Sequence, residues 1–135
     1  MPPDRSDEVR RWLATACRDL RAGEVVLAAR PPLVEDALFH AQQAAEKAIK
    51  GLLVWHGRSF RKTHDLREVG GTALELDATL EPLLRRAVRL TPFAGVFRYP
   101  TDMGEPTPEE AREALALARE VYDAVLARLP EEARP

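Results

Sequence analysis

Apolar residues recur at steps of three and four over the first thirty positions, the spacing that gives an α-helix one buried face. The stripe consists of Val9, Trp12, Leu13, Ala16, Leu20 and Leu27. The charged residues of this segment, Asp19 among them, fall largely on the other side and are expected to face solvent. Ser6 or Asp7 can cap the first turn, and Pro31 with Pro32 stops the helix. The pattern predicts a first helix that ends before these prolines.

A second helix is predicted from about Val34 to Trp55, and Gly57 ends it. Its apolar face is unusually wide and rich in alanine: Ala37, Leu38, Ala41, Ala44, Ala45, Ala48, Ile49, Leu52 and Leu53. Small side chains let two neighbouring helices approach closely, so this segment is expected to be the central helix of a bundle. Because the face looks wider than one bundle layer needs, we also expect a homodimer.

Two shorter helical segments follow the polar stretch RSFRKTHD. Residues 66–76 form a short helix that Thr63 or Asp65 can cap, weakened by two glycines. A further helix is expected over residues 78–90, with a proline tolerated in its first turn. Residues 91–108 carry four prolines and two glycines and read as a long irregular segment, a kind that is often functional.

The last helix is expected to start after Thr107, because Pro108 and two glutamates suit a first turn. No segment alternates apolar and polar residues as a strand does, and no internal repeat is visible. The length of 135 residues suits one domain. The sequence therefore predicts a single all-α domain over residues 1–135, an up-and-down bundle of four main helices plus one short helix.

The composition is that of a globular chain, with 45% apolar and 31% charged residues and a net charge of -2. This balance excludes a protein that coats nucleic acid by bulk charge, so any anion binding must be local. Neither a signal peptide nor an apolar run long enough to cross a bilayer is apparent, and we expect a cytoplasmic protein with no membrane contact. The single cysteine, Cys17, can form no internal disulfide and is expected to be a small core residue rather than a nucleophile.

Positive charge gathers locally in two places. Residues 40–70 carry six Lys or Arg against three acids, and residues 85–98 carry four arginines and no acid. The densest group is Arg58, Arg61, Lys62 and His64, interleaved with aromatic residues. Arginine matches phosphate geometry, aromatic rings stack on bases, and histidine exchanges protons near neutral pH. The alternative is an ordinary solvated loop whose charges keep the protein soluble.

Signals for a self-contained enzyme are weak. His56 and His64 are eight residues apart with no carboxylate cluster beside them, so no metal site is expected. His40 on the second helix is best explained as a half-buried histidine with a polar partner. No glycine-rich phosphate loop and no Ser-His-Asp arrangement is present. The sequence predicts neither a metal nor another cofactor.

The stretch FHAQQAAEKAIKGLLVWHGRSFRKTHDLREV, followed about thirty residues later by FRYPTD, resembles prokaryotic members of the HEPN family (higher eukaryotes and prokaryotes nucleotide-binding domain). The matching positions, in order, are Gln42 to Lys47, Lys50, Thr63 to Leu66 and Arg98 to Pro100. The resemblance implies a helical bundle, commonly dimeric. It also implies a frequent pairing with a minimal nucleotidyltransferase encoded beside it, in several cases as a toxin-antitoxin system.

Many members of the family are metal-independent ribonucleases that carry an Arg followed four to six residues later by His. Here that pair would fall near Arg98, and FRYPTDMGEPTP contains no histidine. Arg58 and His64 have the required spacing but lie in the loop after the second helix. The resemblance therefore favours a non-catalytic module that binds nucleotide, RNA or a protein partner, and the alternative is a ribonuclease that uses Arg58 and His64 across a dimer.

We expect the ligand site to combine the loop after the second helix with the second arginine-bearing segment and the polar edge of the second helix. Its predicted residues are Arg58, Arg61, Lys62, His64, Arg98, Tyr99, Gln43, Glu46 and Lys47. For the last three, a plain solvent-facing position is the alternative.

Overall fold

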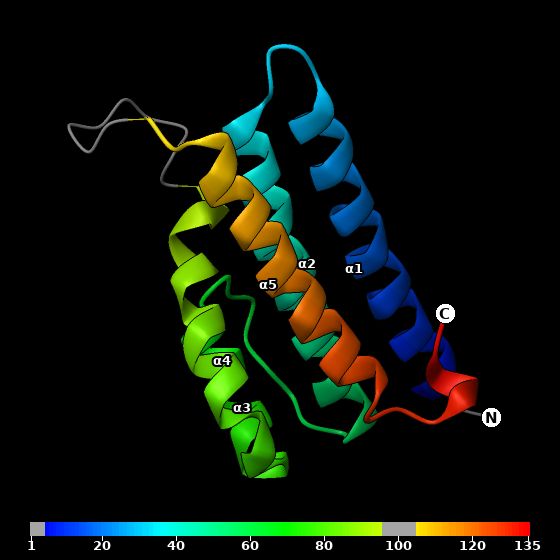
Figure 1. Cartoon of the computed structure of the whole chain (residues 1–135). Helices are drawn as coiled ribbons and strands as arrows, with labels where there is room; N and C mark the ends of the chain where they lie inside the picture. The colour runs from blue at the N-terminus through cyan, green and yellow to red at the C-terminus, as the bar shows by residue number, and fades with distance from the viewer. Residues whose placement is uncertain (1–4, 96–104) are drawn as a thin grey trace.

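The computed structural model describes residues 5–95 and 105–135, and it is built from helices (Figure 1). Three long helices form its body: α1 (Arg5–Ala28), α2 (Val34–Trp55) and α5 (Pro108–Leu126). The shorter elements are α3 (Leu66–Leu76), η1 (Ala78–Leu80), α4 (Glu81–Ala87), η2 (Val88–Ala94) and η4 (Glu131–Ala133). No strand occurs in the described ranges, so the predicted all-α bundle is confirmed.

Helix α2 lies at the centre, in contact with α1, α3, α5 and η2. Its alanines explain this position. Ala37, Ala41, Ala44, Ala45 and Ala48 are all fully buried, and their small side chains let the neighbouring helices pack closely on several sides. The expectation of a central second helix is confirmed. The alanine face is used inside the bundle, however, so its width is no longer an argument for a dimer.

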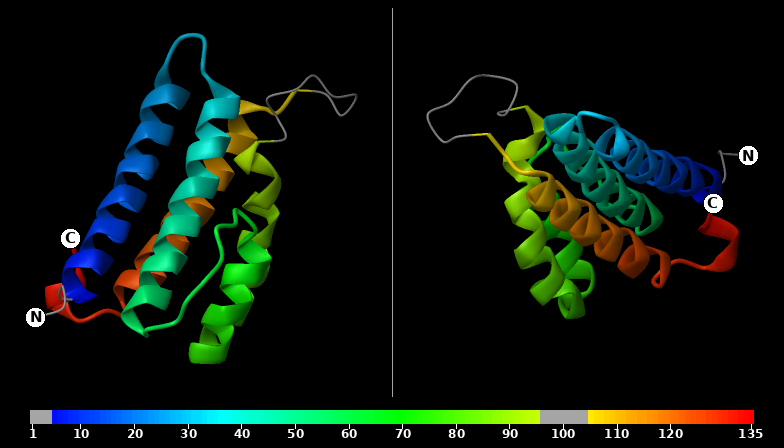
Figure 2. Two further views of the ribbon diagram at one scale, coloured as in Figure 1. Left: turned by 180° about the vertical axis from the view of Figure 1, so that it is seen from behind. Right: turned by 45° about the horizontal axis from the view of Figure 1, so that its top comes forward.

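The connection between α2 and α3 runs back along α2 instead of leading directly into the next helix (Figure 2, left). As a result, α3 begins beside the middle of α2. Asp65 caps α3 by accepting a hydrogen bond from the Arg67 backbone N–H at 2.9 Å. The residues just before this cap therefore lie against the middle turns of α2.

The predicted helix over residues 78–90 is present but divided into η1, α4 and η2, and it continues to Ala94. The prediction that the irregular segment starts at residue 91 was therefore wrong by four residues. Leu90 is buried and holds this stretch against the core, and the short helical turns accommodate Pro92. Helix α5 starts as expected, with Pro108 in its first turn and Thr107 accepting from the Glu110 N–H.

Two expectations about α1 were wrong. Cys17 is exposed and is not a core residue. Asp19, expected to face solvent, is only 8% exposed. The cause is the arrangement of neighbours: α2 and α5 both pack on α1, and the contact with α2 covers the side that carries Asp19. No helix among the described residues is long and apolar enough to span a membrane.

Candidate functional site

Three polar residues interrupt the apolar surface of α2 at intervals of four, so they share one helical face. They are Gln42, Glu46 and Lys50. Counted over the whole residue, backbone included, their exposed fractions are 0%, 3% and 6%. Burying such groups is costly unless each has a partner. Their partners must come from whatever packs on this face, and that is the loop that runs back along α2.

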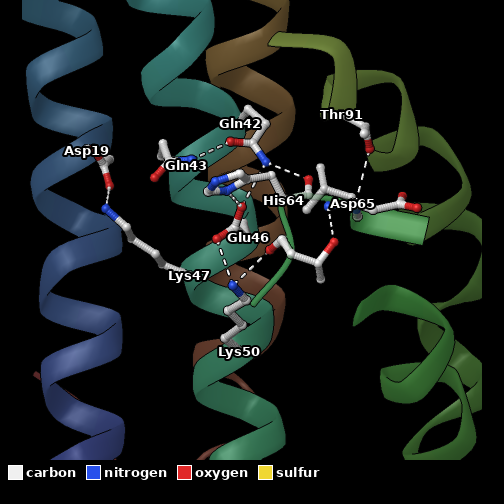
Figure 3. Close-up of polar contacts among 11 residues, drawn as sticks. Asp19, Gln42, Gln43, Glu46, Lys47, Lys50, His64, Asp65 and Thr91 are labelled. Atoms are coloured by element: carbon white, nitrogen blue, oxygen red, sulfur yellow. Dashed lines mark hydrogen bonds and ion pairs between the residues drawn. The ribbon is translucent and has the colours of Figure 1, made fainter. Parts of the chain in front are cut away.

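Each of the three side chains binds the loop (Figure 3). Lys50 Nζ donates to the Thr63 carbonyl at 2.9 Å, and Gln42 Nε2 donates to the His64 carbonyl at 2.9 Å. Glu46 Oε1 lies 2.8 Å from His64 Nδ1. Two consecutive backbone carbonyls and one imidazole of the loop are thus fixed by one stripe of α2.

The same side chains also bind one another. Glu46 accepts from Lys50 at 2.9 Å and from Gln42 at 3.0 Å, and Gln42 accepts from Gln43 at 2.7 Å. Among the described residues, no buried side-chain nitrogen or oxygen lacks a partner. A buried polar network in which every member is satisfied holds its parts in one arrangement.

Glu46 is the hub of this network. Burial opposes its ionisation, but hydrogen bonds from Gln42, Lys50 and His64 and the charge of Lys50 outweigh burial and lower the pKa of Glu46. The carboxylate is therefore ionised at neutral pH and can only accept hydrogen bonds. It follows that the His64 nitrogen facing it, Nδ1, carries a hydrogen.

The ring of His64 is fixed at one nitrogen and open at the other. Its side chain is 67% exposed although its partner Glu46 is 4% exposed. Among the described residues, no hydrogen bond reaches Nε2. In the neutral ring Nε2 is an acceptor, and in the protonated ring it is a donor. A carboxylate that orients an imidazole in this way is the arrangement that prepares histidine for proton transfer or for binding a phosphate.

Lys47 points the other way, toward α1 (Figure 3). Its Nζ lies 2.7 Å from Asp19 Oδ2, and His40 Nδ1 lies 2.9 Å from Asp19 Oδ1. His40 is thus the half-buried histidine with a polar partner that the sequence led us to expect. Lys47 belongs to this second cluster between α1 and α2, whereas Gln43 and Glu46 belong to the network that holds the loop.

The three cations of the loop are all exposed. Arg58 pairs with Glu75 of α3 at 2.5 Å, and Arg61 pairs with Glu68 of α3 at 2.7 Å. Lys62 forms no ion pair within the described part of the chain. The loop therefore places a row of cations outside the ordered network, with Arg58 and His64 bound to different carboxylates. The other two predicted site residues, Arg98 and Tyr99, lie outside the described residues.

Sequence reasoning left Gln42, Lys50 and Asp19 out of the site. For Gln42 and Lys50 a signal was available, because Gln, Glu and Lys at intervals of four among alanines can form a chain of side-chain bonds on one helix face. Asp19 carried no such signal. Among the described residues, no group of three or more His, Cys, Asp or Glu side chains could hold a metal ion.

Several open grooves lie on the described surface, and two of them carry both aromatic and charged side chains. One, of about 350 Å³, is lined by Glu8, Arg11, Trp12, Thr15 and Lys47, between α1 and α2. A larger one, of about 630 Å³, lies between η2 and α5 and contains Arg86, Arg89 and Phe93 together with three glutamates. The two arginines are outnumbered by the three glutamates, so the lining of the larger groove is net acidic and disfavours phosphate.

The fold and the site define a small helical bundle in which a buried polar network presents an oriented histidine beside a basic loop. The family model of the HEPN domain matches residues 9–129, and the chain belongs to this family. Membership implies a function connected with nucleotides or RNA. No curated protein and no solved structure matches the chain.

Proposed function

We propose that this HEPN domain is a binding module for nucleotide or RNA whose contact surface is His64 and the cationic loop of residues 58–62. The observation that carries the proposal is the hydrogen bond between His64 Nδ1 and buried Glu46. It holds the ring with Nε2 outward, on the loop that also carries the exposed cations. A charged or neutral Nε2 can bond a phosphate oxygen or a ribose hydroxyl, respectively.

The loop cations suit this role because their present partners hold them weakly. The pairs Arg58–Glu75 and Arg61–Glu68 are exposed, and exposed pairs of this kind are screened by solvent and contribute little to stability. A phosphate can therefore compete for both guanidinium groups, and Lys62 adds a third cation. The proposed surface also includes Arg98 and Tyr99, which follow from the sequence alone.

We also propose that the domain works as a homodimer and beside a minimal nucleotidyltransferase, in a two-component system of the toxin-antitoxin kind. The support is the family resemblance and the incomplete Arg/His pair near Arg98, which leaves the chemistry to a partner. Sedimentation at micromolar concentration checks the dimer, and a monomer alone there would contradict it. Co-purification with the product of a neighbouring reading frame, followed by an affinity measurement, checks the partner.

A second candidate function, a metal-independent ribonuclease, is favoured by one observation: Glu46 orients His64 as the carboxylate of a catalytic triad orients its histidine. Nε2 would accept the proton of a ribose 2′-hydroxyl while the 2′-oxygen attacks the adjacent phosphorus. The 5′-oxygen of the next nucleotide would leave and take up a proton, giving a 2′,3′-cyclic phosphate. Arg58 of a second copy, reaching the site across a dimer, would stabilise the negative charge on the phosphoryl oxygens.

A salt titration tests the binding function. For single-stranded RNA, about three phosphate contacts give a slope near -2 in a plot of log affinity against log salt, and removing one contact flattens the slope by about 0.7. Arg61→Ala is compared with Arg85→Ala, because the two side chains are 81% and 79% exposed and each pairs with one glutamate. We expect a flatter slope for Arg61→Ala alone. Equal slopes for wild type and both variants would reject the proposed surface.

The ribonuclease candidate has a separate test. Purified protein is incubated with end-labelled RNA in the presence of a chelator, and the products are examined for 2′,3′-cyclic phosphate termini. Cleavage that disappears in His64→Ala and persists in His56→Ala would support it. Cleavage that His64→Ala leaves unchanged would exclude it.

A further inference from the structure

The groove between α1 and α2 lies beside the buried network and is not part of the surface proposed above. Its walls are Glu8, Arg11, Trp12 and Thr15 of α1 and Lys47 of α2. Lys47 is adjacent in sequence to Glu46, the hub of the network. A volume of about 350 Å³ falls within the range of small-ligand pockets and is small for a peptide segment.

Trp12 is the aromatic wall of this groove, and its ring is fixed by neighbours. The ring of Phe60 lies edge-on to it, with centroids 5.9 Å apart and planes at 76°. Lys50 Nζ lies 6.0 Å from its centroid and 5.3 Å from that of Phe60. Since Lys50 also binds Glu46, a continuous series of contacts joins the indole of Trp12 to the imidazole of His64. The indole is half-buried, so part of it still faces the groove.

The polar side chains that line the groove suit the phosphate and the ribose of a nucleotide. Arg11 is exposed and forms no ion pair within the described residues, so its guanidinium is open to an anion. Lys47 is 22% exposed and is held by Asp19. Thr15 donates its hydroxyl hydrogen to the Arg11 carbonyl at 2.8 Å, which leaves the hydroxyl oxygen as an acceptor. Glu8 is a further acceptor, for ribose hydroxyls or an exocyclic amine.

We infer that this groove binds one nucleotide unit, with the base against Trp12 and the phosphate on Arg11. The inference takes its ligand class from the proposed function and adds a base-binding subsite to it. Aromatic stacking accepts any base, because every base has a π face. The unit is either a free nucleotide or one nucleotide of an RNA strand whose neighbouring phosphates reach the loop.

The fluorescence of Trp12 reports on the groove directly. The protein has two tryptophans, and Trp55→Phe leaves Trp12 as the sole tryptophan, which is excited selectively at a wavelength where tyrosine does not absorb. This variant is titrated with AMP, with ribose 5-phosphate and with a short adenosine oligonucleotide. We expect saturable quenching by AMP and by the oligonucleotide, and affinity for ribose 5-phosphate lower by about tenfold because it has no base to stack. An affinity for the oligonucleotide far above that for AMP identifies RNA as the source of the nucleotide, and similar affinities identify free nucleotide.

Arg11→Ala and Arg21→Ala form the matched pair for the phosphate contact. Both arginines are exposed on α1, and helical geometry puts Arg21 on another side of the helix about 15 Å away. We expect AMP affinity to fall about tenfold in Arg11→Ala and to stay unchanged in Arg21→Ala. Both substitutions remove an exposed side chain, so folding is preserved.

Labelled RNA, measured by fluorescence anisotropy on the same proteins, separates this inference from the proposed function. RNA binding that depends on Arg61, with no quenching of Trp12 and no effect of Arg11→Ala, would overturn the inference and leave the proposed function intact. If AMP quenches Trp12 in a manner that depends on Arg11, the nucleotide site in the groove is supported. If the loop cations then have no effect on RNA binding, the loop is rejected as the RNA-binding surface. Equal AMP affinity in Arg11→Ala and Arg21→Ala would also overturn the inference.

Discussion

Lys50 Nζ and Glu46 Oε2 form an ion pair at 2.9 Å in which both side chains are less than a tenth exposed, at 8% and 4%. A buried pair is weak evidence of stability in itself, because desolvation offsets much of the attraction between the charges. Removing one partner is a different matter, since it leaves a buried charge without compensation.

Lys50→Met should therefore destabilise the fold by about 3–5 kcal/mol, measured by urea denaturation at pH 7. The exposed pair between Arg112 and Glu109 is the control, and Arg112→Ala should cost no more than about 1 kcal/mol. Replacing Glu46 by Gln in addition should recover part of the loss, because no unpaired charge is then buried. A loss in Lys50→Met that matches the control would show that the pair is solvated.

The lowered pKa of Glu46 predicts how stability depends on pH. A carboxyl whose pKa is lower in the folded state than its ordinary value of 4.5 stabilises the fold fully above that value. This contribution is lost as pH falls from 4.5 through the folded-state pKa. The stability difference between wild type and Glu46→Gln should thus be constant near neutrality and shrink below pH 4.5, as followed by urea denaturation at several pH values. A difference that grows on acidification would mean that the pKa is raised instead.

Gly51 of α2 and Gly71 of α3 should respond differently to the same substitution, because only Gly51 lies where another helix, α1, packs closely. A Cβ at Gly51 would lie 2.4 Å from Leu13 Cδ2 and 3.2 Å from Trp12 Cβ, in the core, whereas one at Gly71 would meet nothing within 4 Å. Gly51→Ala should destabilise by about 1–3 kcal/mol through overpacking. Gly71→Ala should stabilise by about 0.5–1 kcal/mol, because alanine is the better helix residue. Thermal melts of both variants decide this, and a stabilised Gly51→Ala would show that Leu13 can move aside.

The helices were predictable because each carries a local signal. The apolar period, the prolines and the caps at Asp65 and Thr107 depend on residues close in sequence, and they gave the bounds of α2 and α3 as the structure has them. The burial of Asp19 was not predictable from such local signals. Asp19 lies on α1, and only the position of α2 decides that Lys47 and His40 cover it.

The arrangement of the site was also beyond local reasoning. The residues of the loop were recognisable from their chemistry, but the direction of the loop was not. Because the loop runs back along α2, His64 meets Glu46, eighteen residues earlier, and its backbone carbonyl meets Gln42. A loop that led away from α2 would have left His64 without Glu46 and the polar stripe of α2 without its loop partners.

The geometry of His64 predicts an unusual tautomer. A free neutral histidine carries its hydrogen mainly on Nε2, but ionised Glu46 can only accept a hydrogen bond, and it lies 2.8 Å from Nδ1 of His64. Neutral His64 should therefore carry its hydrogen on Nδ1. His56 provides the internal control, because its ring is exposed and forms no hydrogen bond with the described residues. In nitrogen-15 spectra of uniformly labelled protein, recorded at a pH where the rings are neutral, His64 should show the pattern of the Nδ1–H form and His56 that of the Nε2–H form. The Glu46→Ala variant, if folded, should shift His64 toward the pattern of His56. Identical patterns for the two histidines in the wild type would show that Glu46 does not orient the ring, and the central observation behind the proposed binding surface would be lost.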